Sequence, residues 1–77
     1  MKTVLILGTG CAKCKQLAAN TQRAVAELGI PCDIREVTDV NKICEFGVML
    51  TPALVIDGQV VAVGKVPSTD EIKDMLA

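Results

Sequence analysis

The amino-acid sequence predicts an α/β fold whose elements follow the order β-α-β-α-β-β-α. Short aliphatic runs alternate with segments in which apolar residues recur at helical spacing, and glycines, prolines or an Asp-Gly pair separate them. Of the 77 residues, 51% are apolar and only one is aromatic, so the expected core is small and aliphatic. We therefore expect a single domain that spans residues 1–77.

The first half of the chain predicts a β-α-β unit. Residues 3–7 form an aliphatic run that ends at Gly8 and reads as a buried strand. A helix follows, and Gly29 and Pro31 end it. Its apolar face carries Cys14, Leu17, Ala18, Thr21, Ala24, Val25 and Leu28. The next strand covers residues 32–37, and two strands joined by such a helix are expected to be parallel.

Two further helices are predicted from their capping residues. Thr38 or Asp39 can cap a short helix, which Gly47 closes. Ser68 and Glu71 fit a capping box that opens the last helix. The apolar positions of these two helices are Val40, Ile43, Cys44 and Phe46 in the first, and Ile72, Met75 and Leu76 in the second.

The Asp57-Gly58 pair predicts a tight β-hairpin. Residues 53–56 and 59–63, on either side of it, are rich in β-branched and aliphatic side chains. An Asp-Gly pair between two such runs is typical of a type I′ turn, in which both central residues need a positive φ. These two strands are therefore expected to be antiparallel neighbours.

Two cysteines, Cys11 and Cys14, occupy the junction between the first strand and the first helix. Residues three apart on a helix share one face, so their sulfurs can bond to each other or hold one metal ion together. The free N–H groups and the dipole of a helix N-terminus favour thiolate over thiol, and Lys13 adds positive charge there. The junction therefore predicts thiol chemistry, either redox or metal-binding.

Redox catalysis is the interpretation we favour, because a C-x-x-C near a β-α-β pattern in a cytosolic protein is typical of a redox site. The alternative is that the same thiolates bind a soft metal ion, Cu(I) or Zn(II). Metallochaperone-like domains, however, run β-α-β-β-α-β, and a four-thiolate zinc site usually has two close cysteine pairs. Cys32 and Cys44 lie twelve residues apart on separate elements, and we expect both to be core residues, with no metal bound.

Other classes of protein do not fit the sequence. A secreted disulfide scaffold is not expected, because the four apolar residues after Lys2 are too few for a signal-peptide core. Gly8 and Gly10 lack the third glycine of a dinucleotide-binding fingerprint, and we expect them to let the backbone turn and expose the first thiol. The single aromatic residue and the net charge of −1 argue against nucleic-acid binding, and no apolar run is long enough to span a membrane. We expect a cytoplasmic monomer without nucleic-acid or membrane partners.

Two motifs and the element order together resemble the thioredoxin-fold family. The motifs are Gly10 with Cys11 and Cys14 after the first strand, and Thr51-Pro52 at the start of the hairpin. Within the family, the chain is most similar to the small redox-active disulfide proteins of bacteria and archaea, and the likeness covers its whole length. The resemblance implies a four-stranded mixed sheet flanked by three helices, with a cis-proline facing the dithiol.

The resemblance also implies a role for each residue of the site. Cys11 would be the attacking thiolate and Cys14 the resolving thiol of a thiol–disulfide oxidoreductase. Pro52 would be the cis-proline, and Thr51 would offer its backbone to the substrate chain. No cofactor is expected beyond the redox-active disulfide between Cys11 and Cys14.

The motif departs from that of thioredoxins at two places. Gly10 stands where thioredoxins have a tryptophan, and Ala12-Lys13 stands where they have Gly-Pro. We assign Gly10 and Lys13 to tuning of the thiolate. The partners implied are a disulfide-containing protein substrate and a reductase that the resemblance does not specify.

Overall fold

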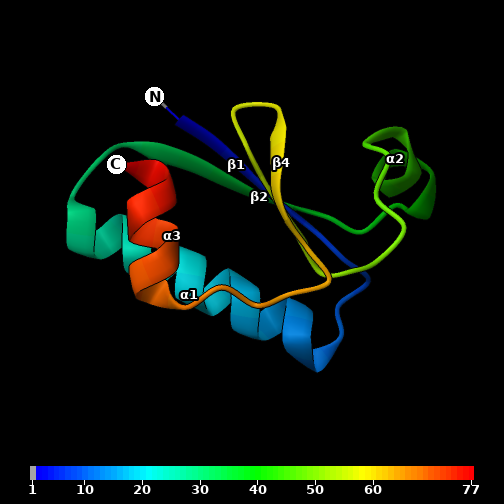
Figure 1. Ribbon diagram of the computed structural model, residues 1–77, viewed down its shortest axis with the longest axis horizontal. Helices are drawn as coiled ribbons and strands as arrows, with labels where there is room; N and C mark the ends of the chain where they lie inside the picture. Colours follow the sequence, from blue (N-terminus) through cyan, green and yellow to red (C-terminus); the bar gives the residue numbers. More distant parts are fainter. Residues whose placement is uncertain (1) are drawn as a thin grey trace.

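The computed structural model of the protein describes residues 2–77. Its elements in chain order are β1 (Lys2–Leu7), α1 (Ala12–Leu28), β2 (Cys32–Val37), α2 (Val40–Glu45), β3 (Ala53–Ile56), β4 (Gln59–Val63) and α3 (Thr69–Leu76) (Figure 1). The predicted order is confirmed, and the first strand begins one residue earlier than predicted, at Lys2.

The four strands form one mixed sheet in the order β2-β1-β3-β4. β1 pairs with β2 in parallel and with β3 in antiparallel orientation, and β3 pairs with β4 across the hairpin. The predicted β-α-β unit and four-stranded mixed sheet are therefore confirmed. β1 lies in the middle of the sheet, so its carboxyl end, where the thiols follow, is supported by neighbouring strands on both sides.

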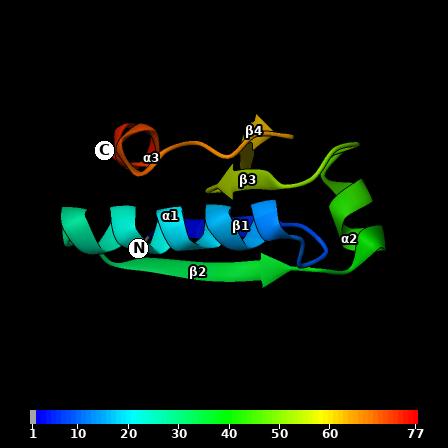
Figure 2. The ribbon, with the colours of Figure 1, turned by 90° about the horizontal axis from the view of Figure 1, so that it is seen from below.

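The sheet separates two apolar clusters, because successive side chains of a strand point to opposite faces. On one face lie α1 and α3, which pack against each other, and α2 covers part of the other face (Figures 1 and 2). The larger cluster comprises Val4, Ile6, Leu17, Ala18, Ala24, Leu54, Ile56, Ile72 and Leu76. The smaller cluster comprises Leu7, Ile43, Val48, Ala53 and Val55.

Local signals act as the sequence predicts at the turn and at the last helix. Asp57 has a φ of 50° and Gly58 a φ of 82°, as a type I′ turn requires. Ser68 Oγ accepts from the backbone N–H of Glu71, and the Glu71 carboxylate accepts from the N–H of Ser68 in return. Of the two candidates for capping α2, Asp39 is the residue used.

The short helix α2 corrects one part of the prediction. Among its apolar positions only Ile43 is buried, whereas Val40 is 60% exposed and Cys44 is exposed. The reason is that a helix of six residues makes fewer than two turns, so only one side chain faces the sheet. Cys44 is therefore not a core residue, and Cys32 is only half-buried. No helix within residues 2–77 has the length and apolar character needed to cross a bilayer.

Candidate active site

Cys11 and Cys14 lie where β1 ends and α1 begins, as predicted. Cys11 is the N-cap of α1, and its sulfur accepts a hydrogen bond from the backbone N–H of Cys14, with N···S 3.4 Å. The two sulfurs are 2.8 Å apart and share a hydrogen bond. Cys11 is exposed, whereas Cys14 lies on the buried face of α1 and is 5% exposed. The pair therefore presents one accessible sulfur and one protected sulfur.

The surroundings of the two thiols shift their pKa values in opposite directions. The hydrogen bond from the Cys14 thiol and then that from the Cys14 backbone N–H lower the pKa of Cys11. Burial, followed by the hydrogen bond to Cys11, raises the pKa of Cys14. The first proton to leave the pair therefore comes from Cys11, and the accessible sulfur carries the negative charge.

Gly8 makes room for the buried thiol. A Cβ at this position would overlap the Cys14 sulfur and would lie 3.1 Å from Cys14 Cβ and 3.9 Å from Pro52 Cα. The sequence suggested that Gly8 is needed for a tight turn, but the positive φ of this loop belongs to Gly10, at 88°. Gly8 is instead required because the backbone of β1, the Cys14 side chain and Pro52 meet there.

The loop before β3 reaches the thiols from a distant part of the chain. The Thr51–Pro52 peptide bond is cis, as predicted, Pro52 is buried and Thr51 is exposed. The backbone N–H of Gly64 donates to the carbonyl oxygen of Pro52 at 2.8 Å. Leu50 packs so closely over Gly64 that a Cβ placed at Gly64 would lie 3.3 Å from the Leu50 Cβ. The structure therefore brings together Pro52, the dithiol and the loop after β4, and this last contact was not predicted.

Gly10 and Lys13, the two residues predicted to tune the thiolate, are both exposed beside Cys11. Lys13 contributes to the lowered pKa of Cys11 through its backbone N–H rather than its ammonium group, after the two larger contributions from Cys14. Gly10 allows the left-handed conformation that leads the chain into the N-cap. The Cys14 thiol and backbone N–H groups of the first turn therefore account for the lowered pKa of Cys11 better than the lysine charge does.

A small cavity lies behind the buried thiol. Its volume is about 100 Å³, well below the roughly 300 Å³ at which pockets for small organic ligands begin. The lining residues are Ile6, Gly8, Gly10, Cys14, Lys15, Glu36 and Thr38. This cavity is too small to admit a larger molecule to Cys14. Of the two sulfurs, that of the exposed Cys11 is therefore the one that a partner can reach from solvent.

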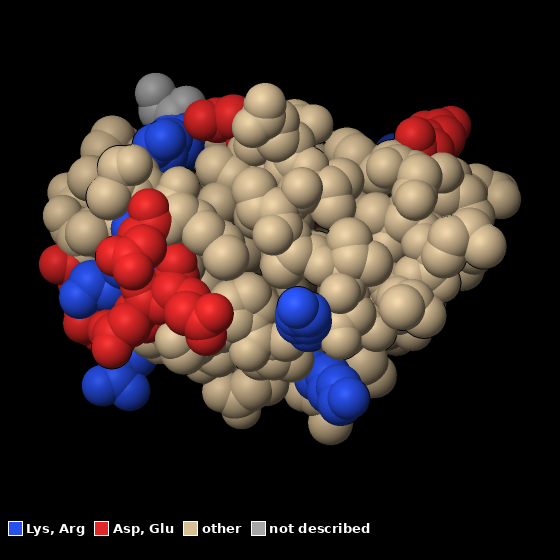
Figure 3. All heavy atoms as spheres, in the orientation of Figure 1, with Lys and Arg blue, Asp and Glu red and all other residues tan. Residues whose placement is uncertain are grey.

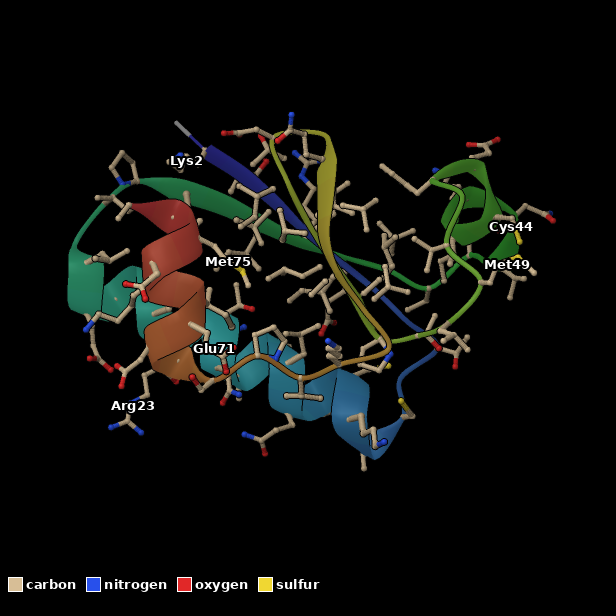
Figure 4. All side chains as sticks on the ribbon, viewed as in Figure 1. Lys2, Arg23, Cys44, Met49, Glu71 and Met75 are labelled. Carbon is tan, nitrogen blue, oxygen red and sulfur yellow. The ribbon has the colours of Figure 1, made fainter. Side chains whose placement is uncertain are left out.

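The other two cysteines do not join this site. Cys44 lies on the outer side of α2 (Figure 4), and Cys32 opens β2. In residues 2–77, no three cysteine, histidine or acidic side chains come together as a metal site. Within residues 2–77, Cys11 and Cys14 are the two cysteines whose sulfurs share a hydrogen bond.

Comparison with known proteins agrees with this geometry. A family model described as a thioredoxin domain matches residues 2–77. A thioredoxin of Methanocaldococcus jannaschii is 49% identical over 76 residues, which cover 99% of this chain and 87% of the relative. A thioredoxin of Methanothermobacter thermautotrophicus is 39% identical over 77 residues, which cover both chains completely.

Proposed function

The chain belongs to the thioredoxin family and is a thiol–disulfide oxidoreductase, and from this premise we propose that it acts on protein disulfides through Cys11 and Cys14. The observation that carries the proposal is the contrast between the two thiols. Cys11 is exposed with a lowered pKa, and Cys14, whose sulfur is 2.8 Å away, is buried with a raised pKa. Soft-metal binding by the same pair is not favoured.

The reaction begins with the Cys11 thiolate. It attacks one sulfur of the substrate disulfide, the substrate S–S bond breaks, and a substrate thiolate leaves as the Cys11–substrate mixed disulfide forms. Cys14 then loses its proton and attacks the Cys11 sulfur, which releases the second substrate thiolate. The substrate gains two electrons and two protons, and the protein retains a Cys11–Cys14 disulfide. A reductase must return two electrons to complete the cycle, and the proposal includes no further cofactor.

The loop before β3 is proposed to hold the substrate. Thr51 is exposed and precedes Pro52, whose Cα lies close to Gly8 and thus to Cys14. Its backbone can pair with an extended substrate segment beside the thiols. Pro52 has no N–H, so this position adds no backbone donor near the sulfurs. The match over residues 2–77 supports treating residues 1–77 as one domain that carries the whole site.

The test is trapping of the mixed disulfide. In Cys14→Ser the second step cannot occur, so Cys11 should remain covalently attached to substrate proteins, as detected by non-reducing electrophoresis and mass mapping. The matched variant Cys11→Ser keeps only the buried thiol and should trap nothing. Equal trapping by the two variants would contradict the proposed roles.

A further inference from the structure

The cationic side chains of the protein fall into two groups. Within residues 2–77, the ion pairs of 4.0 Å or less use Lys2, Arg23, Arg35 and Lys73. The other four cationic side chains are not in these pairs and are all exposed: Lys42 lies on α2, and Lys13, Lys15 and Lys65 belong to the dithiol region. The charge of the dithiol region therefore comes from these last three lysines. We call these three residues the site lysines.

Each site lysine can be placed relative to the dithiol, either by its own position or by a contact of the residue next to it in the chain. Lys13 lies between the two cysteines in the first turn of α1, and Lys15 lines the cavity behind Cys14. Lys65 follows Gly64, whose N–H is bonded to the Pro52 carbonyl oxygen. The lysines therefore approach the site from two segments about fifty residues apart in the sequence.

Negative charge is concentrated elsewhere. The first turn of α3 contains Asp70 and Glu71, and Glu27 on the last part of α1 accepts from both Arg23 and Lys73. Figure 3 shows acidic side chains gathered over α3 and the end of α1, whereas basic side chains near the loop before α3 are surrounded by uncharged surface. Two carboxylates share a cavity with a site lysine: Glu36 lines the cavity behind Cys14 together with Lys15, and Glu71 lines a second cavity together with Lys65. The protein has a net charge of −1, yet its dithiol end is locally positive.

Apolar surface lies beside the site lysines. Leu50 is 63% exposed and packs over Gly64, and the preceding Met49 is 92% exposed. A chain running along Thr51 toward Cys11 would therefore meet an apolar side chain and then positive charges on both sides of the reacting sulfur. We infer that the preferred substrate segment is acidic, with carboxylates close to its disulfide cysteine and an apolar residue that contacts Leu50.

This inference rests on the proposed function and adds a substrate class to it. The physical reason is charge complementarity, which increases the rate of encounter between oppositely charged surfaces by about tenfold or more at low salt. The effect should weaken with salt, because the Debye length falls from roughly 10 Å at 0.1 M to roughly 3 Å at 1 M. The lowered pKa of Cys11 comes mainly from Cys14, and the charges of the site lysines are not needed to explain it. We therefore assign those charges to substrate binding.

The experiment compares disulfide peptides of one sequence whose residues next to the cysteine are aspartate, asparagine or lysine. Second-order rate constants for reduction are measured at low and high salt, with hydroxyethyl disulfide as a small neutral substrate and oxidised glutathione as a small anionic one. We expect the acidic peptide to react about tenfold faster than the basic peptide at low salt, and the difference to shrink at high salt. The acidic peptide should also react faster than oxidised glutathione.

A matched pair of variants separates docking from thiolate chemistry. The double variant Lys15→Gln, Lys65→Gln, which leaves Lys13 in place between the two cysteines, should lose most of the difference between peptides while reducing hydroxyethyl disulfide at an unchanged rate. Lys73→Gln, whose lysine pairs with Glu27 at 3.2 Å, should keep the full difference. Circular dichroism and thermal melts confirm that the variants are folded.

Three results would overturn the inference: equal rates for the three peptides, an undiminished preference in the double variant, or faster reduction of oxidised glutathione than of the acidic peptide. Failure of the proposed function has a different signature. In that case Cys11→Ser would reduce hydroxyethyl disulfide and the peptides as fast as the unmodified protein does.

Discussion

The four cysteines of the molecule differ in their surroundings: the structure brings the sulfurs of Cys11 and Cys14 together, and it keeps Cys32 and Cys44 on separate elements. Cys11 and Cys14 share the first turn of α1, and their sulfurs are 2.8 Å apart. Cys32 begins β2, and Cys44 lies on the outer side of α2 (Figure 4). Both are free cysteines, and within residues 2–77 neither shares a hydrogen bond with another cysteine. Exposure is not what distinguishes the pairs, because Cys11 and Cys44 are both exposed.

The difference shows that the place of a cysteine in the fold, rather than its exposure, decides which groups surround its sulfur. Cys11 is an N-cap, so the N–H of Cys14 points at its sulfur and a second thiol lies one turn further on. Cys44 lies inside a six-residue helix whose N-cap is Asp39. A strand leading directly into a longer helix is therefore the feature that brings two cysteines together, and in our proposal this makes them a redox couple.

The largest expected effect is in the oxidation of the two pairs. Mild oxidation should produce one disulfide, between Cys11 and Cys14, and leave Cys32 and Cys44 reduced, because the latter two lie on separate elements. Mass spectrometry after differential alkylation and proteolysis measures this directly. A Cys32–Cys44 disulfide formed at a comparable potential would remove the distinction between the pairs.

A smaller effect is expected from filling the space next to Cys14. Gly8→Ala places a methyl group against the Cys14 sulfur, and such overpacking should lower the free energy of unfolding by about 1–3 kcal/mol. Because the resolving thiol must move, closure of the Cys11–Cys14 disulfide should also slow relative to the attack by Cys11. Denaturant unfolding and stopped-flow measurement of the two steps check both effects.

Gly47→Ala is the control for this variant. Gly47 has a φ of 75° and open space around its Cα, so an alanine is strained by roughly 1–2 kcal/mol without touching the thiols. This variant should lose stability while keeping the ratio of the two rate constants. If Gly8→Ala keeps that ratio as well, Gly8 has only a structural role.

Most of the fold could be predicted because its signals are local. Asp57 and Gly58 form the predicted type I′ turn, and Ser68 caps α3 as predicted, since both depend on residues within a few positions. Cys44 was assigned to the core because it belongs to an apolar cluster in the sequence. A helix as short as α2 is not long enough for helical periodicity to identify its buried face, and the structure places Cys44 in solvent.

From local patterns alone the site was predictable only where it is contiguous, and the place of Thr51-Pro52 in it was predicted from the resemblance to the thioredoxin-fold family. The spacing of Cys11 and Cys14 indicates the dithiol, but the need for Gly8 arises from its contact with a side chain six residues away and with Pro52. Likewise, Gly64 lies beside Pro52 because β4 pairs with β3 and the Gly64 N–H bonds to the Pro52 carbonyl oxygen. Such contacts depend on tertiary packing, and no local pattern in the sequence encodes them.

The most direct test of the central claim is the pH dependence of alkylation at the two thiols. The fully reduced protein is treated with limiting iodoacetamide across a pH series, and the modified cysteine is identified by mass mapping. We predict that Cys11 reacts first at every pH and reaches half its maximal rate below the pH typical of a cysteine thiol, because its pKa is lowered, while Cys14 reacts only at higher pH, because its pKa is raised. Faster alkylation of Cys14, or a Cys11 profile at or above that of an ordinary thiol, would contradict the account.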